Sequence, residues 1–251
     1  MAHPARANGA YRMVAAVVRP FLRATTRRDW RGTDNLRREG GFIAAANHAT
    51  ELDPLTFAHM LYDQGIAPRI LAKASLFKVP LLGGILRSTG QLPVDRGTTR
   101  AADSLEPAVR ALAAGEVVAV FPEGTLTRDP DLWPMAGKTG VARLALASRA
   151  AVVPVAQWGA TELLPRYSKR LRPFPRKQVH VLVGRPVPLD DLYDRPRDAA
   201  VLREATDRVL DAITELLEQI RGEQAPRPRF DLRDHPDYQV RQTVYPPVPG
   251  R

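Results

Sequence analysis

The chain has 251 residues, of which 44% are hydrophobic, and its 37 Lys and Arg residues outnumber 27 Asp and Glu residues, giving a net charge of +10. A chain of this length can bury one sizeable α/β core, so we expect one globular unit. It contains no cysteine, which excludes disulfides, thiolate metal sites and a covalent intermediate on cysteine. A basic protein invites nucleic acid as a partner, but no recognised nucleic-acid motif is present, and we expect no such partner.

The first expected element is an amphipathic helix near the N-terminus, where residues 1–40 hold nine Arg against two Asp and one Glu. Its apolar stripe consists of Tyr11, Val14, Ala15, Val17, Val18, Phe21 and Leu22, with Arg12, Arg19 and Arg23 close by. A basic helix of this kind lies in a membrane interface, and we assign that role to residues 1–34. The sequence has no apolar run of about 18 residues and no signal-peptide core. We therefore expect a peripheral protein on the cytoplasmic face of the cell membrane.

A histidine and an aspartate five positions apart are the first candidate catalytic residues. On a regular helix this spacing would turn the two side chains about 140° apart. His48 and Asp53 can meet if a strand ends near Asn47 and a helix starts at Asp53, with Pro54 at its first position. The carboxylate would then fix the imidazole tautomer and leave the other ring nitrogen free as a general base for a hydroxyl. Alternatively, Asp53 only caps the helix and His48 is a loop residue, although a carboxylate has lone pairs for both tasks.

Further candidates follow other apolar runs. Glu123 comes after the buried-strand pattern of residues 117–121, and strand ends are where sites of α/β proteins form. Gly124 would let the backbone approach a ligand closely, or would only permit a tight turn. Arg96 and Lys73 offer cations suited to a phosphate, but each could instead be a solvated surface residue.

Four segments, in a fixed order, carry a resemblance to a known family. They are residues 47–53 (NHATELD), 90–96 (GQLPVDR), 121–125 (FPEGT) and 152–155 (VVPV). In order and type they resemble the four motifs of the glycerolipid acyltransferases, specifically the 1-acylglycerol-3-phosphate (lysophosphatidic acid) acyltransferases, over roughly residues 35–190.

The resemblance implies transfer of a fatty acyl group from an acyl thioester to the sn-2 hydroxyl of 1-acyl-sn-glycerol-3-phosphate, giving phosphatidic acid. The donor would be acyl-coenzyme A or acyl carrier protein, and neither a cofactor nor a metal ion would be required. His48 would be the base and Asp53 the residue that orients it. The glycerol phosphate end of the acceptor would be held by Arg96, Glu123 and Gly124, to which we add Thr125 and Lys73.

The chain departs from the family pattern at one position. Many members have Arg directly after Glu-Gly-Thr, whereas this chain has Leu126, with Arg128 two residues later. This weakens a phosphate role for the loop and leaves room for another lysolipid or a glycolipid as acceptor. Lys138, just before a predicted helix, could bind the ligand or be a surface residue. A non-enzymatic alternative is a membrane-binding scaffold with the same fold, whose signature would be the loss of the His or the Asp.

The remaining segments are predicted to be scaffold. We expect helices over residues 101–114, 141–150 and 199–220, and a strand over 179–183 in which His180 is structural. Residues 166–177 carry six Lys or Arg and no acid, and could meet anionic headgroups or coenzyme A phosphates. We predict an acyltransferase domain over residues 35–221, with a mixed, largely parallel α/β sheet flanked by helices. Residues 222–251, rich in Pro and Arg, should form a tail that packs on the surface or is mobile.

Overall fold

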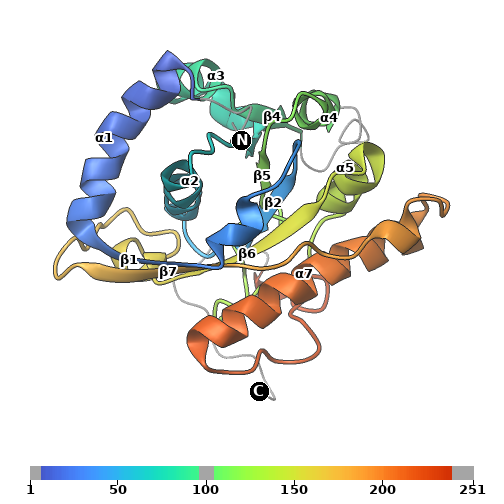
Figure 1. Ribbon diagram of the computed structural model, residues 1–251. Helices are drawn as coiled ribbons and strands as arrows, with labels where there is room; N and C mark the ends of the chain where they lie inside the picture. The colour runs from blue at the N-terminus through green and yellow to red at the C-terminus, as the bar shows by residue number, and fades with distance from the viewer. Residues whose placement is uncertain (1–6, 96–104, 239–251) are drawn as a thin grey trace.

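The computed structural model describes residues 7–95 and 105–238, and in this part of the chain seven strands form one sheet. Figure 1 shows how the elements are arranged. The strands are β1 (Thr26–Arg31), β2 (Ile43–Ala46), β3 (Arg69–Lys73), β4 (Leu92–Val94), β5 (Val118–Val120), β6 (Val152–Trp158) and β7 (Lys177–Val183). Their order across the sheet is β1-β7-β6-β2-β5-β3-β4. Strands β2 to β6 run parallel to one another, β7 is antiparallel to β6, and β1 is parallel to β7. The prediction of a mixed, largely parallel sheet is therefore confirmed.

Helices cover both faces of this sheet (Figure 1). They are α1 (Gly9–Thr25), α2 (Asp53–Asp63), α3 (Leu82–Ser88), α4 (Glu106–Ala113), α5 (Gly140–Ser148), α6 (Ala160–Leu163) and α7 (Ala199–Arg221). Successive side chains of a strand point to opposite faces. In β2, Ile43 and Ala45 accordingly pack in the core cluster of α4, α5 and α7, whereas Ala44 and Ala46 pack in the cluster of α2. All four residues are 0% exposed, so β2 lies at the centre of the molecule.

Most scaffold predictions agree with these elements. The helix predicted over residues 101–114 begins later, as α4 at Glu106, and residues 101–104 lie outside the described residues. Helix α7 begins at Ala199 and ends where Gly222 takes the left-handed conformation, with φ of 68°. Helix α5 ends earlier than predicted because Arg149 is left-handed, with φ of 52°. Strand β7 begins two residues before the predicted start. His180 on β7 lies 2.8 Å from the Asp29 carboxylate of β1, measured from Nδ1 to Oδ2, as a structural pair between the outer strands.

Helix α1 lies against α2 and is tied to it by an acidic residue. The Asp63 carboxylate, at the end of α2, accepts hydrogen bonds from Arg19 of α1 at 2.5 Å and from Arg28 of β1 at 3.1 Å. On the outer side of α1, Met13, Val17 and Phe21 are 68%, 72% and 41% exposed. No helix within the described residues combines the length and apolar character needed to cross a membrane. Helix α1 is therefore fixed to the body by these polar contacts and by the buried Ala15 and Leu22, and it presents other apolar side chains outward.

The tail is described as far as Tyr238, and this part packs on the body. Arg229 lies 2.7 Å from Asp211 of α7, between Nη2 and Oδ1, so the chain after α7 doubles back along that helix. Phe230 and Tyr238 are 2% and 5% exposed. Of the two outcomes expected for the tail, the structure shows packing on the surface for residues 222–238.

Candidate functional site

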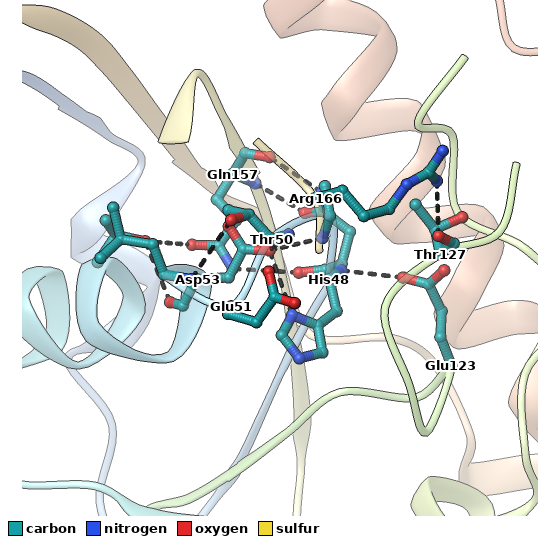
Figure 2. A network of polar contacts seen from close by, with 12 residues as sticks. His48, Thr50, Glu51, Asp53, Glu123, Thr127, Gln157 and Arg166 are labelled. Carbon is teal, nitrogen blue, oxygen red and sulfur yellow. Dashed lines mark hydrogen bonds and ion pairs between the residues drawn. The ribbon is translucent and has the colours of Figure 1, made fainter. Parts of the chain in front are cut away.

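His48 and Asp53 meet as their spacing predicts. Strand β2 ends at Ala46, the chain turns through residues 47–52, and α2 begins at Asp53 with Pro54 in its first turn. His48 Nδ1 lies 3.2 Å from Asp53 Oδ2 (Figure 2). Because the ring nitrogens lie on different sides of the imidazole, Nε2 is left free of this contact. The His48 ring stacks on Phe121, with 4.2 Å between centroids, and its side chain keeps 14% exposure.

The Asp53 carboxylate also holds the turn that carries His48. Its Oδ2 accepts hydrogen bonds from the backbone N–H groups of Ala49 and Thr50, at 2.5 and 2.8 Å. These donors belong to the turn before the helix, so Asp53 orders the turn as well as contacting the imidazole. Of the two roles that the sequence left open, the contact with the imidazole is present, whereas the helix has its N-cap at Leu52 and no side-chain cap hydrogen bond, so Asp53 does not cap it.

A buried amide network lies behind the same turn and was not found from the sequence. The Asn47 side chain donates to the backbone carbonyl of Gln157 at 2.9 Å and accepts from the Gln157 N–H at 2.8 Å. The Gln157 side chain donates to the Asn47 carbonyl at 3.1 Å and accepts from the Thr56 hydroxyl at 2.9 Å. All three residues are at most 2% exposed. The network joins the ends of β2 and β6 to the first turn of α2, and so fixes the direction in which the chain leaves β2.

Glu123 supports the main chain of His48 from the other side (Figure 2). It follows β5, the neighbour of β2, and is 1% exposed. Its Oε1 accepts from the His48 backbone N–H at 2.9 Å and its Oε2 from the Met135 N–H at 3.1 Å. Burial raises the pKa of Glu123 to about 8, although these two donors act in the opposite direction. The structure thus places this carboxyl group behind the turn that carries His48 rather than on an open surface.

The loop after Glu123 is largely buried by contacts with neighbouring parts of the chain. Gly124 has φ of 71°, and a Cβ there would come within 3.0 Å of Lys138 Cγ, so glycine suits both the turn and the neighbouring lysine. Thr125, beside it, is partly exposed. Leu126, at the position where the family pattern has Arg, is buried at 7% exposure. Arg128 is also buried, and its guanidinium donates to the Tyr238 carbonyl at 2.8 Å.

The candidate cations lie along the same edge of the sheet. Lys73 ends β3, and Lys138 lies next to Gly124 beyond β5, so both follow the carboxyl ends of parallel strands. With strand neighbours about 4.8 Å apart, β3 lies about 10 Å from β2, beyond the Glu123 strand. Arg96 lies outside the described residues, in the gap between Asp95, one residue beyond β4, and Leu105. The chain therefore enters the Arg96 segment from the strand next to Lys73.

An apolar cavity of about 310 Å³ opens beside His48. Its walls come from α1, α2, β3 and α3. The lining residues include Val14 and Val18 of α1, Leu55 and Ala58 of α2, Leu71 of β3, Ile85 and Leu86 of α3, with Lys73, His48 and Phe121. Pockets of this size and character hold apolar ligands, and the His48 imidazole lies on the wall.

The end of the cavity between α1 and α2 is formed by aromatic and basic side chains. Tyr11 stacks on Tyr62 with 5.6 Å between ring centroids, and burial raises the pKa of Tyr11 above its usual value. The Arg19 guanidinium lies 4.9 Å from the Tyr62 ring centre. Burial raises the pKa of the Asp63 carboxyl, but the hydrogen bonds from Arg19 and Trp30 lower it by more than burial raises it. The net shift of this pKa is downward. Among residues 7–95 and 105–238, no three His, Asp or Glu side chains gather in a way that could hold a metal ion.

Comparison with known proteins gives a consistent family. The acyltransferase family model matches residues 27–158. A 1-acyl-sn-glycerol-3-phosphate acyltransferase of Bacillus subtilis is 27% identical over 192 residues, 74% of this chain and 88% of the relative. An uncharacterized protein of Mycobacterium leprae is 34% identical over 60% of this chain and 42% of its own length. The crystal structure of the 1-acyl-sn-glycerophosphate acyltransferase PlsC from Thermotoga maritima superposes with a TM-score of 0.61 at 21% identity, over 84% of this chain and 82% of that one.

A largely buried His–Asp pair lies at the carboxyl end of a central parallel strand, beside an apolar cavity, and this end of the sheet is where ligand sites of α/β proteins form. Because the family model covers more than half of the residues, the chain belongs to the acyltransferase family. The chain spans less than half the length of some of its relatives, including the Mycobacterium leprae protein and a Borreliella burgdorferi 1-acyl-sn-glycerol-3-phosphate acyltransferase, of which it covers 48%.

Proposed function

We propose that this protein transfers a fatty acyl group from an acyl thioester to the sn-2 hydroxyl of 1-acyl-sn-glycerol-3-phosphate, giving phosphatidic acid in phospholipid biosynthesis. The observation that carries the proposal is the His48–Asp53 pair, whose Nδ1 and Oδ2 atoms are 3.2 Å apart and whose histidine lines the apolar cavity. The names of the Bacillus and Borreliella relatives support this acceptor. The donor is acyl-coenzyme A or acyl carrier protein, as a substrate rather than a resident cofactor.

In this mechanism His48 is the general base. Its Nε2 takes the proton of the acceptor hydroxyl as the oxygen attacks the thioester carbonyl carbon. Asp53 accepts from Nδ1–H, keeps Nε2 free and stabilises the positive charge that develops on the imidazole. When the carbonyl re-forms, the carbon–sulfur bond breaks, and the imidazolium returns its proton to the thiolate. The product is an ester and a free thiol, and His48 is again neutral.

The acyl chain lies in the cavity between α1, α2 and α3. This places its apolar methylenes against the apolar walls, and each methylene removed from water contributes about 0.8 kcal/mol. The carbonyl end then lies at the mouth, where His48 and Phe121 form the wall. The cavity therefore supplies both binding energy and the position of the reacting carbon.

The acceptor phosphate is held on the β3–β4 side of the site. Lys73 at the end of β3 and Arg96 beyond β4 supply positive charge, and Gly124 and Thr125 supply a narrow, partly exposed turn of backbone. Lys138, exposed beside Gly124, is a third cation within this region. Glu123 contributes indirectly, because both of its oxygens accept from backbone N–H groups.

An anionic membrane surface is the partner that brings these substrates together. The outer side of α1 exposes Met13, Val17 and Phe21, and the basic segment of residues 166–177 exposes Leu171 and Phe174 at 45% and 74%. Of the six cations predicted to meet a membrane there, Arg166 is buried and Arg176 donates to backbone carbonyls, which leaves four. Apolar side chains among cations insert into an interface, while each nearby Lys or Arg adds about 1 kcal/mol at an anionic surface. We place the protein on the cytoplasmic face of the membrane, without a spanning helix in the described part.

A second candidate is the same chemistry on another lysolipid or a glycolipid. Leu126 favours it, because a buried apolar side chain stands where many family members have Arg. The two candidates differ in their need for a phosphate. Comparing acceptors with and without phosphate, in wild type and Arg96→Ala, separates them: loss of activity in the variant on lysophosphatidic acid alone supports the first candidate, and indifference supports the second.

The primary test measures release of free thiol from long-chain acyl-coenzyme A and from acyl carrier protein, with and without lysophosphatidic acid. We expect acceptor-dependent release that falls by at least about 10³-fold in His48→Ala, because general base catalysis contributes that much. His180→Ala is the matched control, since His180 forms a similar pair with Asp29 on the outer strands. Liposome binding should survive in both variants. Full activity in His48→Ala would reject the mechanism, and liposome binding without thiol release from any donor would favour the scaffold alternative.

A further inference from the structure

The C-terminal segment reaches the loop that supports the catalytic histidine. Residues 226–238, here called the strap, leave α7 and lie over residues 122–136, the loop between β5 and α5. The Phe230 carbonyl accepts from the Ala136 N–H at 2.8 Å, and the Phe230 side chain packs in one buried cluster with Met135 and Tyr238. The Tyr238 carbonyl accepts from Arg128 of the same loop at 2.8 Å. The strap thus holds the loop at two points, at Arg128 near the middle of the loop and at Ala136 near its end.

From these contacts a short chain of hydrogen bonds leads to His48. Met135, whose side chain packs on Phe230, donates its backbone N–H to Glu123 Oε2 at 3.1 Å. Glu123 Oε1 accepts from the His48 N–H at 2.9 Å. The same loop holds the other side of the His48 peptide, because the Thr127 N–H donates to the His48 carbonyl at 2.6 Å. Both backbone groups of the histidine are therefore fixed by the loop on which the strap lies.

The strap is fastened to the body independently of this loop. Arg227 and Arg229 both contact Asp211 of α7, at 2.9 and 2.7 Å. Within the strap, Phe230 stacks on His235 at 4.5 Å and meets Tyr238 edge to face at 5.4 Å. A segment that is anchored on a long helix and stiffened by three aromatic rings can hold a loop in place. It lies outside residues 27–158, the part that matches the family model.

We propose that the strap is a positioning element for acyl transfer, in which Phe230 and Tyr238 fix the position and orientation of His48 through Met135 and Glu123. This inference rests on the proposed function of His48. A displacement of a reacting group by about 1 Å can cost about 100-fold in rate. A strap that has lost its aromatic anchor should therefore lower kcat while leaving the acyl cavity, formed by α1, α2 and α3, intact.

The test compares kcat and KM of the full chain in Phe230→Ala, Phe230→Leu and a stability control. We expect Phe230→Ala to lower kcat by about 10- to 100-fold with little change in KM for the acyl donor, and Phe230→Leu to restore most of the loss. Leu192→Ala is the control, because Leu192 is 0% exposed but belongs to a different core cluster. It should lower the melting temperature without a comparable fall in kcat. Wild-type kcat in Phe230→Ala, or an equal fall in Leu192→Ala, would overturn the proposal.

Hydrogen exchange keeps the strap testable if the proposed reaction itself fails. Phe230→Ala should lose amide protection over residues 44–52 and 121–137, but not over α2 or α3. A double variant with Glu123→Gln should lose little more kcat than Glu123→Gln alone, since both changes act on one chain of contacts. If amide protection over residues 44–52 is unchanged in Phe230→Ala, the proposed positioning role of the strap is overturned, whatever the activity. Absence of thiol release from the wild type would reject only the proposed function.

Discussion

The edge of the sheet that carries His48 and the cavity beside it are built in opposite ways. At the edge, the His48 turn is held by buried polar contacts from Asp53, Glu123 and the Asn47–Gln157 network, which leave the imidazole little freedom. The cavity is enclosed by apolar side chains of separate helices, and α1 is fastened to α2 by Asp63. Hydrogen bonds are directional and apolar contacts are not. The edge can therefore fix one geometry of the His48 side chain, while the cavity can accommodate apolar ligands of different shape.

The edge should be intolerant of an isosteric change at Asp53. Asparagine keeps the shape and can still accept from Ala49 and Thr50, but it carries no charge to stabilise an imidazolium. We expect Asp53→Asn to lower kcat by about 10³-fold with little change in KM. Steady-state kinetics measure this, and Asp29→Asn, beside His180, is the control. A variant with wild-type kcat would show that the edge does not depend on this charge.

The buried Glu123 should make stability depend on pH. Its pKa of about 8 in the folded protein exceeds the ordinary value of 4.5, because burial disfavours the charge. Between these pH values the folded carboxyl keeps a proton that the unfolded chain has lost. The free energy of unfolding should therefore fall as pH rises through this window, by no more than about 5 kcal/mol.

Chemical denaturation between pH 5 and 8, in wild type and Glu123→Gln, measures this contribution. The variant cannot ionise at this position, so its unfolding free energy should change less with pH than that of the wild type. Other titrating groups are common to both proteins and cancel in the difference. Parallel curves for the two proteins would show that Glu123 does not titrate in this range.

The cavity should tolerate substitution and respond by changing its preference. Ala58 lines it from α2. Ala58→Phe would fill part of the space in which we propose that the acyl chain lies. Excluding two methylenes should lower kcat/KM for long-chain donors by about tenfold relative to shorter ones. A series of acyl thioesters of increasing length measures this preference. Ala147→Phe, on the exposed side of α5, is the matched control, and equal losses for all chain lengths would argue against the cavity as the acyl site.

Sequence reasoning succeeded where the structure depends on local chemistry. Proline after Asp53 marked the start of α2, and the five-residue spacing from His48 then required a turn, which is what the chain forms. Gln157 and Phe230 could not be found in this way, because their contacts join segments more than 90 residues apart. The orientation of Glu123 was also beyond prediction, since it depends on how residues 122–136 fold back to present the Met135 N–H.

The two outermost strands have a consequence for association between molecules. Strand β1 (TRRDWR) ends one side of the sheet with four charged residues out of six, and β4 ends the other with only three residues, the central one being Pro93. Charge, short length and proline each discourage a strand of another chain from extending a sheet. Both edge strands of the sheet therefore disfavour edge-to-edge aggregation, even though the central strands are apolar.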